Sequence, residues 1–486
     1  MSKEIRTIEP QSVWKNFADL NAVPRPSKKE EKVIAFMMDF GKSLGLPTQK
    51  DGAGNVIISK PATKGMEDRK AIVLQSHLDM VHQKNNDTDF DFDNQGIEMY
   101  IDGDWVRAKG TTLGADNGLG VATIMAILES TDIAHPAIEA LFTIDEETGM
   151  TGAKELDSSI LKGDILLNLD TEEDDEIGIG CAGGVDISAT RTYKQEPIPS
   201  KVEAFEIKVK SLQGGHSGMD IIKGLANANK LMNRILFDTY TNFGLRIASL
   251  YGGGLRNAIP RESTAIVVID QLNKEAFLEE TAILTSEIKE EFKSLEPNLE
   301  VSITPTQMPE MVMEIGVQEG FLKAVYAAHN GVYRMSPDID GLVETSNNIA
   351  RIYVGDGAVE VHCLTRSSVE SNKIDLANSL RSSFELAGFE VELSGDYPGW
   401  APNPDSDILQ VLDKIYQEQN NEKANIAACH AGLECGILGS HYPKMDMISF
   451  GPTIRGAHSP DERASISSMQ KFWKFTLRVL EEIPPR

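Results

Sequence analysis

The 486-residue sequence has few cysteines for its length. The four thiols are Cys181, Cys363, Cys429 and Cys435, and they show no Cys-x-x-Cys spacing. This excludes a disulfide framework and a zinc knuckle and favours reduced thiols. Cys429 and Cys435 flank His430, a combination that a soft-metal site would use, but packing is the commoner role of a small thiol.

Long apolar runs and an excess of basic charge are also absent. No stretch of about 18 uninterrupted apolar residues occurs, and the opening Met-Ser-Lys-Glu-Ile-Arg is not followed by an apolar signal segment. The net charge of −27 would repel nucleic acid and anionic membrane surfaces. These features predict a cytoplasmic protein with neither nucleic acid nor a membrane as a partner.

The composition is that of a globular protein, with 41% hydrophobic and 25% charged residues. At this length one ordinary core is not expected, so the prediction is two domains. Ser27 and Glu30 have the spacing of a capping box, which predicts a helix that starts after Ser27.

Up to about residue 185, strands and helices alternate. Expected strands cover residues 71–75, 138–144 and 165–169, and expected helices cover residues 11–20, 119–129 and 153–161. This order indicates an α/β domain with a mostly parallel sheet flanked by helices.

The order of predicted strands and helices changes in the middle of the chain. Residues 204–304 follow a β-α-β-β-α-β order, and residues 321–392 show a similar pattern of helix, paired strands, helix and strand. From about residue 405 helices and strands alternate again, as in the first part of the chain. The sequence therefore predicts one domain built from residues 1–185 and 399–486, with an α+β domain of two related halves inserted over residues 186–398.

A possible metal ligand follows the strand predicted at residues 71–75. His77 and Asp79 are two residues apart, so strand alternation would point both side chains to the same side. His77 would bind a metal through one nitrogen, while Asp79 accepts a hydrogen bond from the other. A single His-x-Asp pair of this kind more often has a structural role. Further motifs are therefore needed before it indicates a metal site.

Four more stretches place acids or an imidazole beside strands or in glycine-rich turns. Glu146 and Glu147 follow one predicted strand, Asp170 follows another, and His458 lies in a turn-rich loop after a third. Asp116 lies in a glycine-punctuated loop before a predicted helix, where a plain N-cap is the alternative. Adjacent carboxylates at a buried strand end repel each other unless a cation or a shared proton lies between them, and the neighbouring motifs favour a metal over a solvated charge pair.

Together these motifs give five candidate ligands, namely His77, Asp116, Glu147, Asp170 and His458. Two imidazoles and three carboxylates suit zinc, cobalt or manganese better than calcium. Five ligands exceed what one catalytic zinc needs, so two metals that share one bridging carboxylate fit the count.

Six motifs jointly resemble those of the bacterial Xaa-His dipeptidases, also called aminoacyl-histidine dipeptidases or peptidase D and placed with the cytosolic non-specific dipeptidases. That family belongs to a two-zinc superfamily of aminoacylase-like and carboxypeptidase-like enzymes. The motifs lie at residues 76–79, 114–117, 145–147, 214–218, 430–435 and 456–460. The resemblance runs the length of the chain.

The resemblance implies a role for each candidate ligand. His77 and Asp170 would hold one zinc, and Glu147 and His458 would hold the other. Asp116 would bridge the two zinc ions. Cobalt or manganese are alternative metals.

The resemblance also implies roles for five residues outside the ligand set. Glu146 would be the general base that takes a proton from the metal-bound water, and Asp79 would orient its neighbouring histidine ligand. His216 would stabilise the tetrahedral oxyanion. Asn257 and Arg366 would contact the substrate, and an arginine suits a free C-terminal carboxylate.

The implied protein is a two-zinc exopeptidase-like enzyme whose inserted ferredoxin-like domain is a lid, with homodimerisation through that lid. It would cleave unblocked dipeptides, among them Xaa-His dipeptides such as carnosine. Three alternatives stay open on the same site: an N-acyl amino acid amidohydrolase, a tripeptidase and a catalytically silent metal-binding relative. Whether His216 acts in its own or the partner subunit's active site also stays open.

Overall fold

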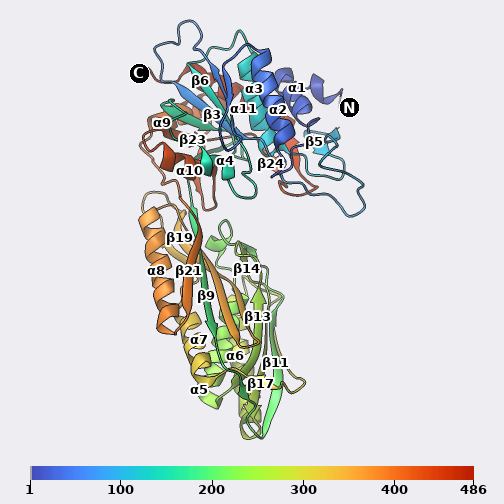
Figure 1. Ribbon diagram of the computed structural model, residues 1–486, viewed down its shortest axis with the longest axis vertical. Helices are drawn as coiled ribbons and strands as arrows, with labels where there is room; N and C mark the ends of the chain where they lie inside the picture. Colours follow the sequence, from blue (N-terminus) through green and yellow to red (C-terminus); the bar gives the residue numbers. More distant parts are fainter. Residues whose placement is uncertain (1–2) are drawn as a thin grey trace. The chain divides into compact units, whose positions relative to one another are not determined.

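The computed structural model describes residues 3–486, which form two compact units (Figure 1). Unit 1 comprises the chain up to Gly180 together with Pro402–Ala428 and Leu433–Arg486. Unit 2 comprises Cys181–Ala401 and the short segment Cys429–Gly432. No helix among the described residues is long and apolar enough to cross a membrane.

Unit 1 contains an eight-stranded sheet whose four central strands are parallel. In spatial order the strands are β1 (Thr48–Lys50), β2 (Val56–Lys60), β6 (Ile138–Thr143), β3 (Ile72–His77), β7 (Ile165–Asn168), β23 (Asp446–Ser449), β8 (Glu176–Cys181) and β22 (Asn425–Cys429). Every residue of β3 and β7 is buried, as expected for strands covered on both faces. The predicted parallel arrangement holds for the centre of the sheet, whereas β1, β2 and β8 pair antiparallel.

The helices of unit 1 carry the apolar surface that covers this sheet. They are α1 (Gln11–Leu20), α2 (Glu31–Ser43), α3 (Ala115–Glu129), α4 (Thr151–Glu155), α9 (Asp407–Asn420), α10 (Glu434–His441) and α11 (Ile466–Glu481). A smaller sheet contains β24 (Ile454–Arg455), β25 (Arg463–Ser465), β5 (Trp105–Ala108) and β4 (Met99–Asp102). Helix α4 ends earlier than predicted, because residues 156–161 form turns.

Helix α3 packs tightly against β3 and the end of β7. A Cβ at Gly120 would lie 2.4 Å from Ser76 Oγ and 2.7 Å from the Leu169 carbonyl oxygen. Both distances are too short for a side chain, so Gly120 lets the helix approach the two strands. This packing places Asp116 close to the carboxyl ends of β3 and β7.

The predicted capping box at Ser27 and Glu30 is wrong. Helix α2 begins at Glu31, and its N-cap makes no side-chain hydrogen bond. The Ser27 hydroxyl instead donates to Asp79 Oδ2 at 2.8 Å, and Glu30 Oε1 accepts from the Lys28 N–H. The Ser27 hydroxyl therefore bonds to the buried Asp79 carboxylate instead of capping α2.

Unit 2 contains a nine-stranded sheet made of two halves with the same topology. The first half has the spatial order β16 (Glu300–Pro305), β11 (Val202–Lys210), β15 (Ser263–Asp270), β13 (Arg246–Gly253). The second has β21 (Glu390–Tyr397), β9 (Gly183–Thr192), β20 (Ala358–Ser367), β19 (Val343–Gly355), with β18 (Gly331–Met335) paired to β19. Each half contains a β-α-β-β-α-β unit, to which the second half adds β18, and β13 pairs with β19 to join the halves.

The second half is discontinuous in sequence. Its first strand, β9, precedes the whole first half, which is why the sequence pattern from residue 321 onward begins with a helix. Helices α5 (Ala228–Phe243), α6 (Lys274–Phe292), α7 (Ile315–Ala327) and α8 (Glu370–Leu386) pack on one face of the sheet in a shared apolar core (Figure 1).

Two short ribbons complete unit 2. They are β10 (Glu196–Pro197) with β17 (Met311–Val312), and β12 (Gly215–His216) with β14 (Ala258–Ile259). Single 3-10 turns lie at Ile5–Thr7, Ile221–Lys223 and Gln271–Asn273.

Candidate active site

The four parallel strands of unit 1 end at one edge of the sheet, and each is followed by a candidate ligand. Strand β3 ends in His77, β6 leads to Glu146 and Glu147, and β7 leads to Asp170. Strand β23 leads to the loop that carries His458. Since β6, β3, β7 and β23 are neighbours in that order, their loops converge on one place.

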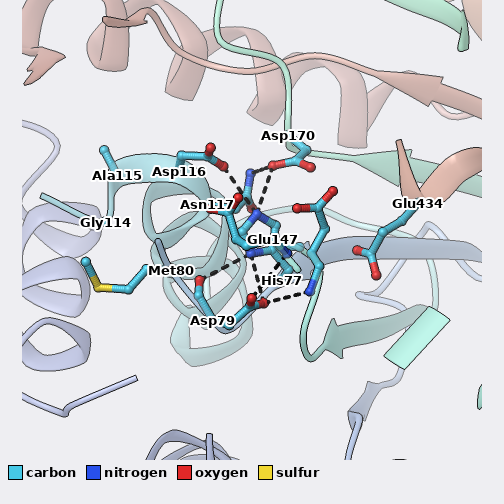
Figure 2. A network of polar contacts seen from close by, with 12 residues as sticks. His77, Asp79, Met80, Gly114, Ala115, Asp116, Asn117, Glu147, Asp170 and Glu434 are labelled. Carbon is cyan, nitrogen blue, oxygen red and sulfur yellow. Dashed lines mark hydrogen bonds and ion pairs between the residues drawn. The ribbon is translucent and has the colours of Figure 1, made fainter. Parts of the chain in front are cut away.

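His77 lies at the centre of this convergence, with its ring buried (Figure 2). Its Nε2 lies 3.2 Å from Asp116 Oδ1 and 3.5 Å from Asp170 Oδ1. Its Nδ1 lies 3.3 Å from Asp79 Oδ1. One nitrogen therefore faces two carboxylates, while the other faces the carboxylate two residues ahead in the sequence.

Asp116 contacts a different imidazole through each of its carboxylate oxygens. Oδ1 faces His77, and Oδ2 lies 3.2 Å from His458 Nε2. The same His458 nitrogen lies 3.0 Å from Glu147 Oε2. The groups of described residues that could hold a metal include two triads that share Asp116, namely His77–Asp116–Asp170 and Asp116–Glu147–His458. A third group combines His77 with Glu146 and Glu147.

Asp79 is fully buried and joins two parts of the site. Besides His77, it accepts hydrogen bonds from the backbone N–H groups of Glu146 and Glu147, at 3.1 and 3.3 Å. Burial alone would raise the pKa of Asp79, but the hydrogen bond with His77 and its other partners lower it. Asp79 therefore stays ionised, and it orients both the imidazole and the acidic turn.

Several carboxylates of the site lie close together, and most of them are buried or half-buried. Burial raises the pKa of Asp170 to about 6 and that of Glu146 well above its usual value. Hydrogen bonds with Asp116 and Glu147 raise the pKa of His458 to about 11. Burial opposes ionisation of Asp116, yet His458 and His77 hold its pKa below the usual range. The two imidazoles and the carboxylates thus lie close enough to shift one another's pKa values.

This donor set fits divalent cations. Glu147 Oε1 is buried and has no hydrogen-bond partner among the described residues, so a buried lone pair points at no protein donor. The two imidazoles and three carboxylates combine the nitrogen and oxygen ligands that zinc, cobalt and manganese accept. Among the described residues, none of the groups of three or more side chains that could hold a metal includes a cysteine.

Two buried glutamates beside the cluster were not singled out from the sequence. Glu434, at the start of α10, is labelled in Figure 2. It accepts hydrogen bonds from Gln75 Nε2 and Thr143 Oγ1, both at 2.7 Å. Glu462 accepts hydrogen bonds from backbone N–H groups of the Asp116 loop. Burial raises the pKa of each to about 7. Both lie within or next to motifs already noted, but only tertiary contacts reveal what they bind.

In unit 2, the ribbon of β12 and β14 fixes His216. Its Nδ1 accepts hydrogen bonds from the N–H groups of Gly218 and Met219, at 3.2 and 3.1 Å. The proton of the neutral ring therefore resides on Nε2. Burial, helped by the charge of Arg366, lowers the pKa of His216, so the ring is a neutral hydrogen-bond donor.

Asn257 lies in the turn that precedes β14, beside the ribbon that carries His216. Its carbonyl oxygen accepts from the Ser217 N–H at 2.8 Å. The Asn348 side chain donates to the two flanking carbonyls, of Arg256 at 3.1 Å and Ala258 at 2.8 Å. The backbone of Asn257 is held in this way while its side chain is exposed.

Arg366 lies on β20 and is only 5% exposed. One terminal nitrogen donates to the Tyr397 hydroxyl at 2.9 Å, and Nε is buried without a partner among the described residues. Its neighbour across the β19 pairing, Ser346, contacts His430 Nε2 at 2.8 Å. Arg366 is thus a buried cation with unused hydrogen-bonding capacity.

A parallel-stranded α/β unit with imidazoles and carboxylates at its carboxyl edge is the architecture of a metal-dependent hydrolase. Residues 73–482 match the model of "Peptidase family M20/M25/M40". The chain belongs to this peptidase family.

Two relatives match over the full length. The cytosol non-specific dipeptidase of Escherichia coli (strain K12) is 42% identical over 484 residues, which are 99% of this chain and 100% of the relative. The crystal structure of aminoacylhistidine dipeptidase from Vibrio alginolyticus is 44% identical, covers 100% of both chains and has a TM-score of 0.94. The mixed α/β fold predicted from the sequence is thereby confirmed.

A more distant match is a tripeptidase from Staphylococcus aureus, with 16% identity, coverage of 98% of this chain and 99% of that chain, and a TM-score of 0.57. At that identity the likeness shows the fold alone.

Proposed function

We propose that this protein is a two-metal dipeptidase that hydrolyses unblocked dipeptides, among them Xaa-His dipeptides. The observation that carries the proposal is the placement of Asp116, whose two carboxylate oxygens face two different histidines in two ligand triads. The full-length relatives, an aminoacylhistidine dipeptidase and a cytosol non-specific dipeptidase, support dipeptides as the substrate class.

In this proposal His77 and Asp170 hold one cation, Glu147 and His458 hold the other, and Asp116 holds both. Zinc is the proposed metal, with cobalt or manganese as substitutes. When bound, the cations would polarise the scissile carbonyl and make water a better nucleophile. Asp79 fixes the tautomer of His77 so that Nε2 presents its lone pair to the metal.

Glu146 is the proposed general base. It would accept a proton from the attacking water and then deliver that proton to the leaving amine. Burial raises the pKa of the Glu146 carboxyl above its usual value, which makes this carboxylate a stronger base than a solvated glutamate.

His216 is proposed to donate its Nε2–H to the developing oxyanion. We expect His216→Ala to lower kcat by about 10²–10³-fold with little change in KM, because an oxyanion donor acts mainly in the transition state. Steady-state kinetics on one dipeptide would measure both constants. His441→Ala, which replaces a histidine on α10 of unit 1, is the matched control and should keep both constants. A KM effect with unchanged kcat would contradict the oxyanion role.

Arg366 is proposed to bind the C-terminal carboxylate of the dipeptide. We expect Arg366→Ala to raise KM as well as to lower kcat, because this ion pair forms in the ground state and persists in the transition state. Dipeptide amides lack the carboxylate, so Arg366→Ala should change their kcat/KM little. Arg334→Ala, at a half-exposed arginine of the same unit, is the control. An equal loss on dipeptides and on their amides would remove Arg366 from this role.

A substrate panel tests the function itself. The purified, zinc-loaded enzyme should hydrolyse β-Ala-His and Leu-Gly much faster than tripeptides or N-acetylated amino acids. Preference for a tripeptide or an N-acetylated amino acid would instead support the tripeptidase or amidohydrolase alternative. Metal binding without hydrolysis of any substrate would indicate a catalytically silent relative.

The proposed location is the cytosol and the proposed assembly is a homodimer through unit 2. The location follows the E. coli relative, which is described as a cytosol enzyme. Mixing His216→Ala with Glu146→Ala chains tests the dimer. Recovered activity would mean that the two chains share a site, and no recovery after confirmed subunit exchange would place His216 in its own active site.

A further inference from the structure

Glu462 is a buried glutamate that belongs to the His458 loop but points at a different segment. It is 2% exposed, four residues after His458. Its Oε2 accepts from the N–H groups of Leu113 and Gly114, at 2.6 and 2.8 Å. Its Oε1 accepts from those of Ala115 and Asp116, at 2.7 and 3.3 Å.

These four bonds use the full accepting capacity of one carboxylate, which is about four lone-pair sites. All four donors are consecutive N–H groups of residues 113–116, the last two of which belong to the first turn of α3. Figure 2 labels three residues of this segment, Gly114, Ala115 and Asp116. Two loops that are far apart in the sequence, one with His458 and one with Asp116, are therefore tied together by one side chain.

The same segment is held from its other side by Arg25, which is 1% exposed. Arg25 Nη2 donates to the Gly114 carbonyl oxygen at 2.5 Å. Its Nη1 donates to the carbonyl oxygens of Leu78 and Asp79, both at 3.1 Å. Arg25 thus ties the Asp116 segment to the end of β3, which carries His77.

The segment is tightly packed at Gly114. A Cβ at Gly114 would lie 2.5 Å from Arg25 Nη2 and 2.8 Å from Met80 Sδ, and Gly114 has a φ of +69°. Only glycine fits this conformation and this contact without strain. The backbone before Asp116 is therefore held between the buried Glu462 carboxyl group and the buried Arg25 guanidinium.

We propose that Glu462, with Arg25 on the opposite side, is a positioning residue that sets the spacing between His77, Asp116 and His458 and so prepares the two-metal site. The inference rests on the proposed function. Glu462 would touch neither metal nor substrate, and its effect would pass through the backbone of Asp116 and the loop of His458.

Glu462→Gln is the diagnostic substitution because it keeps the size of the side chain. A glutamine offers one carbonyl oxygen, so its NH₂ group would oppose two of the four N–H donors. Glu462→Asp keeps the charge but is one methylene shorter, so it should be milder. Asp461→Asn is the matched control, since it removes the carboxylate of the neighbouring exposed residue in the same loop.

The primary measurement is zinc affinity by competition with a chromophoric chelator, without any substrate. We expect Glu462→Gln to weaken zinc binding by about 10–100-fold, the usual effect of losing a group that orients metal ligands. Glu462→Asp should fall between this variant and the wild type, and Asp461→Asn should match the wild type. At saturating zinc, Glu462→Gln should recover most of its kcat.

A merely structural role predicts a different pattern. Glu462→Gln would then lower the melting temperature of the metal-free and zinc-loaded proteins equally and leave zinc affinity within about twofold of the wild type, which would overturn the proposal. If Glu462→Gln does not fold, a Glu462→Asp variant that binds zinc with wild-type affinity would also overturn the proposal. A wild-type protein that binds zinc but cleaves no dipeptide would refute the proposed function and leave this zinc measurement valid.

Discussion

Glu146→Gln should lower kcat for dipeptide hydrolysis by about 10²–10⁴-fold, the contribution of a positioned general base. An amide of the same shape cannot accept the proton of the attacking water, nor return it to the leaving amine. The backbone N–H of Glu146 still reaches Asp79, so the turn that carries Glu147 should keep its conformation. Metal content should therefore stay at the wild-type value.

The measurement pairs single-turnover or steady-state rates with elemental analysis of the same preparation. Glu155→Gln, a carboxylate-to-amide change at an exposed position on α4, is the control and should leave both values unchanged. A Glu146→Gln enzyme with near wild-type turnover would rule out Glu146 as the base. A large loss of metal would instead indicate that Glu146 acts as a ligand.

Asp116→Ala should abolish measurable dipeptide hydrolysis, with a loss of more than about 10³-fold, because each metal contributes several kcal/mol to the transition state. The substitution removes an oxygen ligand from both triads at once. It also removes the anion that lies between two cations and offsets their repulsion. Both metals should therefore bind more weakly.

The comparison with Asp170→Ala makes this prediction specific. Asp170 belongs to only one of the two triads that share Asp116, so its removal should weaken mainly one metal. Elemental analysis after dialysis should give lower metal content for Asp116→Ala than for Asp170→Ala. Equal content in the two variants would contradict a bridging role for Asp116.

The convergence of the ligands was predictable because it follows from sheet geometry. Parallel neighbouring strands end at one edge, so acids and imidazoles placed after several such strands must meet there. His77, Glu147 and Asp170 follow three adjacent strands, and His458 follows the fourth. Asp116 lies near the start of α3. Because Gly120 has no side chain, α3 packs closely against β3 and the residue after β7, and this places Asp116 beside the other candidate ligands.

Other features depend on partners that no local pattern reveals. Ser27 and Glu30 have the spacing of a capping box, but a hydrogen bond to the buried Asp79 takes the Ser27 hydroxyl elsewhere. The second half of the unit 2 sheet takes its first strand, β9, from before the first half. Glu462 is an ordinary acid in a turn-rich loop until the structure shows four N–H groups around it.

The catalytic roles of the site residues are implied by the resemblance of the motifs to a known family, and they stay predictions. The neutral state of His216 illustrates this point. Its two backbone donors fix the proton on Nε2, a detail that the glycine-rich motif at residues 214–218 does not encode. The same motif in another backbone conformation would present the other nitrogen.

The most direct test of the central claim is a zinc titration of chelator-stripped enzyme, followed by hydrolysis of β-Ala-His or Leu-Gly. The stripped enzyme should be inactive, and activity should return with added zinc and reach its plateau at two equivalents per chain. Full activity at one equivalent would contradict the shared-carboxylate, two-metal site, and activity that survives complete removal of metal would contradict a metal-dependent mechanism altogether.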